Sequence, residues 1–352
     1  MKLRSILLAA VGGLALAAPA SEPCSTSTLS RIAFGACLRQ DRLQPIWEAV
    51  AAAQPELFVL TGDSICLDST NASDKAGAYA AQAAQSGFAK LREARPVWGT
   101  WDDHDYGVND AGAEYPDREV SQKLFLDFLG EPADSPRRAR PGVYDARVYG
   151  PPERRVQIIL LDTRSFRGPL AVRADRAEGE GPYEATSDRT TTLLGADQWT
   201  WFREQLRVPA ALRLVVSSIQ VVAEDHHWEK WMNFPHERRM LFNMIIDTEA
   251  DGVLFLSGDR HLAELSMMDA GLGYPLYDLT SSSLNLPMGE PLAEINRRRI
   301  SEVFTGANFG LVTVDWELAD PLITLEVRDE RGDPRIHHEI PLSALRAAGH
   351  EW

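Results

Sequence analysis

Residues 97–110 read Val97-Trp98-Gly99-Thr100-Trp101-Asp102-Asp103-His104-Asp105-Tyr106-Gly107-Val108-Asn109-Asp110. The stretch opens as a short apolar strand and then places four acidic residues and a histidine between positions 102 and 110. Carboxylates packed this closely repel one another unless a cation or a set of hydrogen-bond donors holds them. A solvated acidic loop is the alternative, but the tryptophans, the tyrosine and the glycines favour a loop packed against the protein. We therefore expect a functional site at the end of this strand.

Apolar strands alternate with helices on both sides of this stretch. Such alternation is typical of α/β proteins, in which sites form at the carboxyl ends of strands. The last three strands form an antiparallel meander at about 308–340. Two βα layers with added strands predict a four-layer αββα sandwich of two mixed β-sheets flanked by helices. The expected strands are 31–34, 56–61, 97–98, 143–148, 156–161, 214–219, 252–256, 263–268, 276–279, 309–316, 322–328 and 336–340, and the expected helices are 43–53, 73–94, 118–129, 196–206 and 237–248. Residues 165–192 are polar, contain glycine and show no clear period, so we expect a long excursion that forms a flap over the site.

Residues 1–20 have the pattern of a secretory signal peptide. Lys2 and Arg4 precede an apolar run, and Ala18-Pro19-Ala20 forms a cleavage site of small residues. The apolar run is short for a membrane anchor, and no later stretch could span a bilayer. We therefore expect a soluble, exported chain, periplasmic or extracellular, whose residues 21–352 form one domain that includes the meander.

The chain is strongly acidic, with a formal net charge of −15 over 352 residues. Loss of the signal peptide would change this charge to −17, because the peptide carries two positive residues and no negative ones. A surface of this sign repels the phosphates of nucleic acid, so duplex binding is not expected. A small phosphate ester is compatible with it, because bound cations reverse the local field.

Three apolar strands end in acidic turns. These turns are Leu60-Thr61-Gly62-Asp63, Trp101-Asp102-Asp103-His104 and Leu256-Ser257-Gly258-Asp259-Arg260-His261. One Gly-Asp pair is an ordinary turn. Three such turns at strand ends can bring carboxylate and imidazole groups to one point, where two cations could share them.

These turns resemble those of the PhoD-like (alkaline phosphatase D) metallophosphatases, a variant of the calcineurin-like phosphoesterases. The resemblance extends from Phe34 to about Gly310, and its most specific piece is Trp101-Asp102-Asp103-His104. Its other pieces are the Gly-Asp turns given above, Phe34-Gly35-Ala36-Cys37, Asp105-Tyr106-Gly107-Val108-Asn109-Asp110-Ala111-Gly112, Leu161-Asp162-Thr163-Arg164 and Ser217-Ser218-Ile219-Gln220. The resemblance implies an αββα sandwich and hydrolysis of phosphate esters by a metal-activated hydroxide.

The resemblance also implies a role for individual residues. Asp63 would bridge two metals, and Asp103 would complete the coordination shell of one of them. Cys37 would bind iron as a thiolate. Asp259 and His261 would ligate from the other sheet. His104 would act as general acid and Arg164 would grip phosphate oxygens. Two or more metal ions are expected, Fe³⁺ with Ca²⁺ by resemblance and Zn²⁺ or Mn²⁺ as alternatives.

The chain departs from the family pattern at two positions. Cys66 stands where the family usually has a tyrosine, so it either adds a second thiolate or forms a disulfide with Cys37. Gln220 stands where relatives of the broader fold place a histidine ligand. Groups expected to bind substrate or to hold the ligands by hydrogen bonds are Asp105, Asn109, Gln220 and Asn308.

Two other classes of protein remain as alternatives. Gly62-Asp63-Ser64-Ile65 resembles the nucleophile block of GDSL-type esterases, in which Ser64 would attack and Asn109 would stabilise the oxyanion. The spacing of Asp259 to His261 is one residue too short for the base of that family. A non-catalytic metal-binding protein is the other alternative, against which His104 offers an acid among the ligands. The substrate, whether a phosphomonoester, a phosphodiester or a phospholipid, and the oligomeric state are left open.

Overall fold

The computed structural model describes residues 26–177, 179–289 and 294–347. The expected signal peptide, residues 1–20, lies outside these residues. Within them, no helix combines the length and the apolar character that crossing a bilayer requires.

The first sheet contains six strands in the order β14-β13-β12-β1-β2-β3. Its parallel half is β1-β2-β3, and the antiparallel meander β12-β13-β14 extends it along the free edge of β1. The strands are β1 (Arg31–Gly35), β2 (Leu57–Thr61), β3 (Val97–Thr100), β12 (Asn308–Asp315), β13 (Leu322–Asp329) and β14 (Pro334–Pro341). The meander predicted from the sequence is therefore part of this sheet.

The second sheet has the order β10-β11-β9-β8-β5-β4. Strands β5, β8, β9 and β11 are parallel, while β4 and β10 pair antiparallel at the two edges. The strands are β4 (Asp145–Tyr149), β5 (Val156–Leu160), β8 (Leu212–Ser217), β9 (Val253–Ser257), β10 (Ala263–Asp269) and β11 (Pro275–Ser281).

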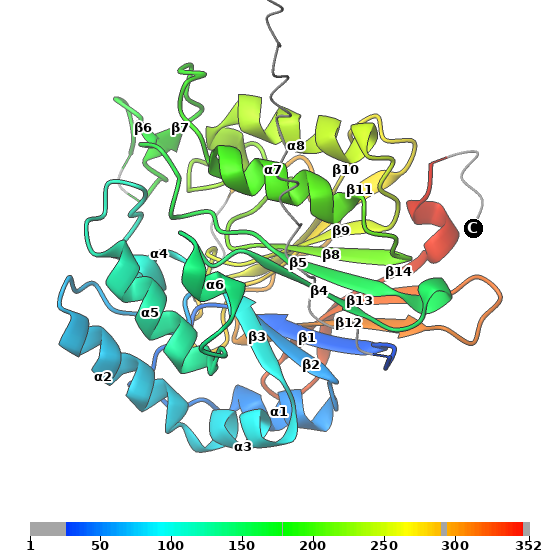
Figure 1. The fold of residues 1–352 in the computed structure, drawn as a ribbon, viewed down its shortest axis with the longest axis horizontal. Coiled ribbons are helices and arrows are strands. Elements are labelled where there is room, and N and C mark those ends of the chain that lie inside the picture. Colours follow the sequence, from blue (N-terminus) through cyan, green and yellow to red (C-terminus); the bar gives the residue numbers. More distant parts are fainter. Residues whose placement is uncertain (1–25, 178, 290–293, 348–352) are drawn as a thin grey trace, which may run out of the picture.

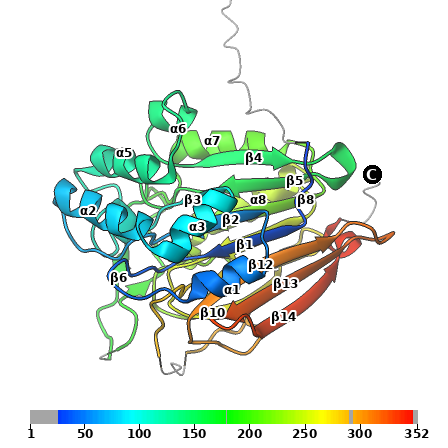
Figure 2. The same ribbon diagram turned by 90° about the horizontal axis from the view of Figure 1, so that it is seen from below.

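Helices cover both outer faces, so the molecule has four layers (Figure 1). Helices α7 and α8 lie over the second sheet, and α1, α2 and α3 lie below the first (Figure 1). Seen from below, the meander extends beyond the layer of helices (Figure 2). The longer helices are α1 (Ile46–Ala52), α2 (Ala72–Ala83), α3 (Ser86–Ala94), α5 (Arg118–Leu129), α7 (Gly195–Leu206) and α8 (Pro235–Asp247). The predicted αββα sandwich is confirmed.

Strand β2 illustrates why the two layers form. Every residue from Leu57 to Thr61 is buried. Leu57 and Val59 belong to the core cluster that fills the space between the sheets, and Phe58 and Leu60 belong to the cluster under the helices. Because successive side chains of a strand point to opposite faces, an uninterrupted apolar strand must be covered on both sides.

The expected helix at 73–94 is two helices, and that prediction was wrong. The chain leaves the helix at Ala84 and Gln85, where Gln85 is extended, and α3 starts again at Ser86. A Cβ on Gly87 would lie 2.6 Å from the Cβ of Trp47 on α1, so the two helices touch through a glycine. The break changes the direction of the chain, so that α3 packs closely against α1.

The expected excursion at 165–192 carries a small hairpin, β6 (Ala171–Val172) with β7 (Tyr183–Glu184). Tyr183 donates its hydroxyl to Asp110 at 2.5 Å, and its N–H donates to the carbonyl of His227 at 2.9 Å. The excursion therefore contacts both the acidic stretch at 102–110 and the tryptophan-rich segment at 226–235, which follows β8.

Candidate metal centre

The carboxyl ends of the parallel strands of both sheets meet at one edge of the sandwich. Cys37 and Asp63 follow β1 and β2, Asp103 follows β3, and Asp259 and His261 follow β9. Thr100 at the end of β3 donates its hydroxyl to the carbonyl of Leu161 after β5, at 2.7 Å, which ties the two sheets together at this edge. The arrangement explains why residues far apart in sequence gather here.

Glycine is required where the two sheets touch. A Cβ on Gly62, after β2, would lie 3.2 Å from the Cβ of Ser218 after β8, and one on Gly258, after β9, would lie 2.8 Å from the Cβ of Ala36 after β1. Each glycine is followed by an aspartate with positive φ, 47° for Asp63 and 67° for Asp259. The Gly-Asp pairs seen in the sequence thus combine close approach of the sheets with a strained turn that aims a carboxylate.

Backbone strain concentrates at this edge. Among the described residues, seven residues other than glycine have positive φ. Five of these seven gather here, and such conformations cost on the order of 1–3 kcal/mol each, so the surrounding structure must hold them. The five are Cys37, Asp63, Asp110, Asp259 and His261.

Two groups of potential ligand atoms share Asp63. One consists of Cys37, Asp63 and His261 and the other of Asp63, Asp103 and His104, and within each group the atoms lie within 4.8 Å of one another. The thiol of Cys37 lies 3.6 Å from Oδ2 of Asp63 and 3.1 Å from the hydroxyl of Ser282. Asp63 is thus placed so that its carboxylate could serve two ions.

The carboxylates of this edge are buried without a protein cation beside each of them. Burial, together with the charges of Asp103 and Asp102, raises the pKa of Asp63 well above its usual range, and burial with Asp102 does the same for Asp259. Within the described chain, neither Asp63 nor Asp259 forms an ion pair with a lysine or arginine. Divalent or trivalent cations would satisfy these groups, so the donor set fits the metals that the sequence implied.

Asp103 differs from its neighbours. Burial opposes its ionisation, but Arg164, His104 and the N–H of Asp110 outweigh burial and lower the pKa of Asp103 to about 2. The N–H of Asp110 donates to Oδ2 of Asp103 at 2.7 Å and that of His104 to Oδ1 at 2.9 Å. Asp103 is therefore a fixed negative charge at ordinary pH.

His104 lies beside Asp68, a residue that the sequence analysis did not single out. Nδ1 of His104 lies 3.2 Å from Oδ1 of Asp68, and the same oxygen accepts the N–H of Asn109 at 2.8 Å. The imidazole remains partly exposed at the pocket, as a group that gives a proton to a ligand must be.

Arg164 is not exposed to any ligand. Its guanidinium is completely buried, with Nε donating to Asp102 at 2.6 Å and Nη1 to Glu229 at 2.7 Å. Arg167 pairs with the other oxygen of Glu229 at 3.0 Å. The structure therefore places Arg164 inside a charge network that joins β3 to the tryptophan-rich segment, away from the position expected for a phosphate grip.

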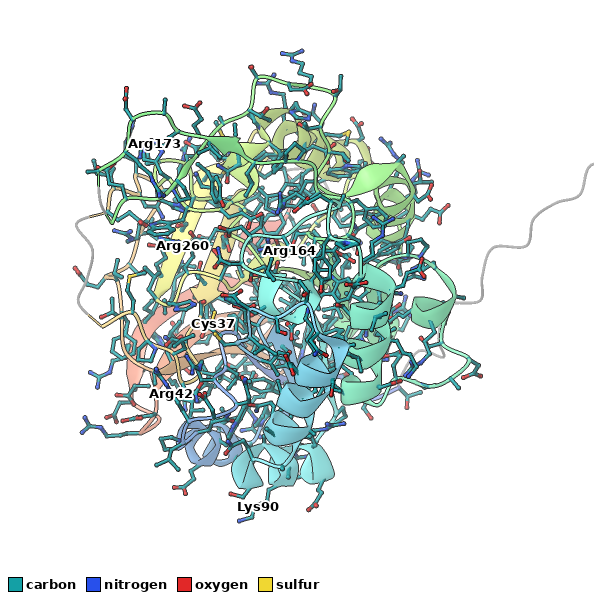
Figure 3. The ribbon with its side chains drawn as sticks, turned by 90° about the vertical axis from the view of Figure 1, so that its left-hand side faces the viewer. Cys37, Arg42, Lys90, Arg164, Arg173 and Arg260 are labelled. Carbon is teal, nitrogen blue, oxygen red and sulfur yellow. The ribbon has the colours of Figure 1, made fainter. Side chains whose placement is uncertain are left out.

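A pocket of about 260 Å³ opens over the ligand groups. Arg260 lines it together with Trp228, whose ring lies 5.8 Å from the guanidinium carbon. One terminal nitrogen of Arg260 is held by both oxygens of Glu294, at 2.7 and 2.8 Å. Cys37, Arg164 and Arg260 come from three different segments and lie around the centre of the face in Figure 3, and of these two arginines only Arg260 lines the pocket.

The predicted supporting groups fall into two sets. Asp105 and Asn109 adjoin the site: the buried carboxylate of Asp105 accepts the N–H of Ser64 at 3.1 Å, and Asn109 lines the pocket. Gln220 is directed elsewhere, because its amide bonds Glu264 and Thr280. Asn308 accepts the hydroxyl of Ser281, next to the serine that contacts Cys37, at 2.7 Å.

Cys66 does not join either ligand group within the described chain. It is free, as Cys37 is, so the disulfide alternative is absent from the structure. Its backbone is clasped by the side-chain amide of Gln40 through bonds of 3.0 and 3.3 Å.

Ser64 offers little support for the serine-esterase alternative. Its hydroxyl is completely buried and has no hydrogen-bond partner among the described residues, so no base contacts it.

Asp68, Glu229 and Arg260 are the site residues that sequence reasoning left without a role. The sequence signal for Arg260 was present, since it lies inside the third Gly-Asp turn, whereas Asp68 and Glu229 carry no local signal.

Two six-stranded mixed sheets with helices on their outer faces, and acidic groups gathered at their shared edge, define a metallophosphoesterase fold. A family model, that of the PhoD-like phosphatases, matches residues 68–285, and the chain belongs to this family. A solved structure, "Structure of PhoD", is similar with a TM-score of 0.73 and 16% sequence identity, covering 94% of this chain and 73% of that one. No curated protein matches the chain.

Proposed function

We propose that this chain is a metal-dependent phosphoesterase that hydrolyses small or lipid-derived phosphate esters, monoesters or diesters. The observation that carries the proposal is the position of Asp63, which belongs to two ligand groups at once and lies where both sheets meet. Membership of a phosphatase family agrees with it.

The residues present divide into two kinds of ligand set. Cys37, Asp63 and His261 combine sulfur, oxygen and nitrogen, a mixture suited to iron or zinc, and Asp63 with Asp103 offers oxygen atoms suited to calcium or manganese. Burial and the charge of Asp63 raise the pKa of the Cys37 thiol, so a metal must displace its proton. Bound cations would supply positive charge against the phosphoryl oxygens and would make a water molecule more acidic.

The protein's own groups would act around the phosphoryl group. Arg260, which lines the pocket, would offer the cationic side chain that contacts the ester in place of Arg164. His104, oriented by Asp68, would donate a proton to the leaving oxygen. Trp228 and Met288 form the less polar part of the pocket, where the organic group of the ester would lie.

Hydrolysis assays with matched variants test this proposal. The chain from residue 21 is assayed with bis(p-nitrophenyl) phosphate, p-nitrophenyl phosphate and p-nitrophenyl acetate, with and without prior chelation. Asp63→Asn should lower kcat for phosphate esters by about a thousandfold, the equivalent of several kcal/mol. Ser64→Ala, a change at the next residue that removes an unpartnered hydroxyl, should leave kcat within about threefold.

Each competing function predicts a different result. Acetate hydrolysis that resists chelation and disappears in Ser64→Ala would establish a serine esterase and refute the proposal. Tight metal binding, lost in Asp63→Asn, with no turnover of any ester would leave the non-catalytic metal-binding protein.

We also propose that the chain is exported by its N-terminal segment. The support is the sequence pattern of residues 1–20 alone. Edman sequencing of the protein recovered from the periplasm or medium of an expressing bacterium should begin at Ser21, and a protein that keeps Met1 in the cytoplasm would contradict export.

A further inference from the structure

A second cavity lies apart from the candidate metal centre. Its volume is about 580 Å³, against about 260 Å³ for the pocket over the metal ligands, and the two have no lining residue in common. It is formed by α5, by the short helix α6 (Pro136–Ala139) with the turn after it, and by Ser165 and Phe166. Helices α5 and α6 lie side by side in both ribbon views (Figures 1 and 2).

The lining of this cavity is basic on a protein that is acidic overall. Four cationic side chains and one carboxylate, that of Glu119, line it, although the whole chain has a net charge of −15. Such a concentration of one sign in a hollow attracts ligands of the opposite sign. The cations are Arg118, Lys123, Arg138 and Arg140.

Among the described residues, two of these cations have no close carboxylate partner. Lys123 and Arg138 both pair with Asp127, at 2.6 and 2.8 Å. In contrast, Arg118 donates to the carbonyl of Ala113 at 3.0 Å and forms no ion pair within the described chain. The carboxylate of Asp145 lies 3.9 Å from Arg140, and within the part of the chain that the structure describes Nε of Arg140 is buried without a hydrogen-bond partner.

The rest of the lining is apolar and firmly held. Leu126 is buried, and Phe166 and Pro141 complete an apolar wall. The side-chain NH₂ of Gln122 lies within hydrogen-bond distance of the carbonyl groups of Arg137 in α6 and of Arg140 and Gly142 in the turn, at 2.7, 2.8 and 3.1 Å, which holds the backbone that carries Arg140. The guanidinium of Arg140 also stacks on Tyr144, 4.2 Å from its ring centre, so this cation is positioned before any ligand arrives.

We propose that this cavity binds a small organic anion that carries an apolar body. Its phosphate, sulfate or carboxylate head would accept bonds from Arg118 and Arg140, and its apolar body would lie against Leu126 and Phe166. The volume falls within the range of about 300–1,000 Å³ that ligand sites occupy. Anion binding in this cavity is independent of the proposed phosphoesterase activity.

Direct binding measurements test the proposal without any turnover. Naphthalene-2-sulfonate, which has no phosphate ester to hydrolyse, is titrated into the chain from residue 21 by isothermal titration calorimetry. Saturable binding of one equivalent is expected, with weaker binding of 2-naphthol, which lacks the charge, and of inorganic sulfate, which lacks the apolar body.

Variants locate the binding site. Arg118→Gln with Arg140→Gln should raise the Kd at least tenfold, since hydrogen bonds to charged groups contribute about 1.5–3 kcal/mol. Arg118→Gln with Lys123→Gln changes only side chains on the exposed part of α5, so it should fold normally and also raise the Kd. Arg42→Gln, at an exposed arginine outside the cavity, is the matched control and should bind as the wild type does, as should Asp63→Asn.

Three results would overturn the proposal. They are the absence of saturable binding to the wild type, an unchanged Kd in the Arg118→Gln, Lys123→Gln protein, and loss of binding in Asp63→Asn, which would place the anion at the metal centre. None of these results bears on ester hydrolysis, so the two proposals fail separately.

Discussion

At the residue scale, we expect a single carboxylate to set the orientation of His104. Asp68 lies 3.2 Å from Nδ1 of His104, and its side chain is 59% exposed, so solvent weakens the interaction. We expect Asp68→Ala to lower kcat by about tenfold, because loss of a carboxylate that orients a histidine typically costs about 10–100-fold. KM should change little. Asp68→Asn, which keeps a side-chain oxygen of the same reach beside Nδ1, should recover most of the activity in the bis(p-nitrophenyl) phosphate assay. Equal losses in both variants would show that Asp68 does not act by orientation.

The two arginines of the site should respond differently to the same substitution. Arg164→Gln removes one partner from a completely buried pair and should lower the free energy of unfolding by about 3–5 kcal/mol. Arg260→Gln should instead raise KM for phosphate esters several-fold, because Arg260 lines the pocket, and it should cost less stability than Arg164→Gln, because its partner Glu294 is partly exposed whereas Glu229 is not. Urea unfolding and steady-state kinetics on both variants, with Glu294→Gln as the control for the ion pair of Arg260, separate the two effects. A raised KM in Arg164→Gln, with a large loss of stability in Arg260→Gln, would show that Arg164 and not Arg260 binds the phosphate.

The residues of the site were predictable to different degrees from the sequence. Asp63, Asp103 and Asp259 were predictable because each follows an apolar strand in a short acidic turn, and parallel strands end at one edge. Arg164 satisfied the same criterion, yet the sequence holds no signal for Glu229, which contacts it across 65 residues. Which carboxylate pairs with a buried arginine depends on the tertiary structure, so the local sequence around Arg164 cannot predict its pairing with Glu229.

At the element scale, Lys75 fixes α2 to the acidic stretch. Its ammonium group is buried and donates to the carbonyl of Asp105 at 3.2 Å and to the hydroxyl of Ser121 on α5 at 3.3 Å. Burial lowers its pKa from the usual 10.5 to about 8. Between these two values the unfolded chain holds a proton that the folded chain has lost, so stability rises with pH across this window, and that gain is lost as pH falls toward 8.

Comparison with Lys75→Met isolates this contribution. Relative to the variant, the free energy of unfolding of the wild type should rise by on the order of 3 kcal/mol between pH 8 and pH 10.5. Chemical unfolding at several pH values over this range measures it, and other groups that titrate there are common to both proteins. Parallel stability curves would mean that Lys75 keeps an ordinary pKa when folded.

Element boundaries show where local sequence stops being informative. The strands and most helices were predictable because their apolar patterns are long and their ends carry glycine, proline or acidic turns. The break between α2 and α3 was not, because Ala84 and Gln85 are compatible with a helix. The contacts made at the break are tertiary: Gly87 approaches Trp47 on α1, and the Gln85 amide donates to the carbonyls of Gln40 and Arg42. In the excursion at 165–192, Tyr183 contacts Asp110 in the tertiary structure, and no repeating sequence pattern predicts this contact.

At the scale of the whole molecule, the candidate metal centre is also a joint between the two sheets. Asp63 and Asp103 follow strands of the first sheet, and Asp259 and His261 follow a strand of the second. Without cations, the burial and mutual repulsion of these groups oppose folding, and ions bound between them would join the two halves. A ligand that binds only the folded state at a hundred times its Kd stabilises that state by about 2.7 kcal/mol.

Metal removal should therefore lower the thermal stability of the entire fold. We expect the chelated protein to regain about 5 °C in Tm when Mn²⁺, Zn²⁺ or Ca²⁺ is returned at a concentration well above its Kd. Ser64→Ala should show the same gain, whereas Asp63→Asn, which removes the carboxylate that both ligand groups share, should show little or none. Differential scanning calorimetry with each ion separately would show which ion stabilises the protein. An equal gain in Asp63→Asn would place the stabilising ion elsewhere and separate the stability of the sandwich from its candidate metal centre.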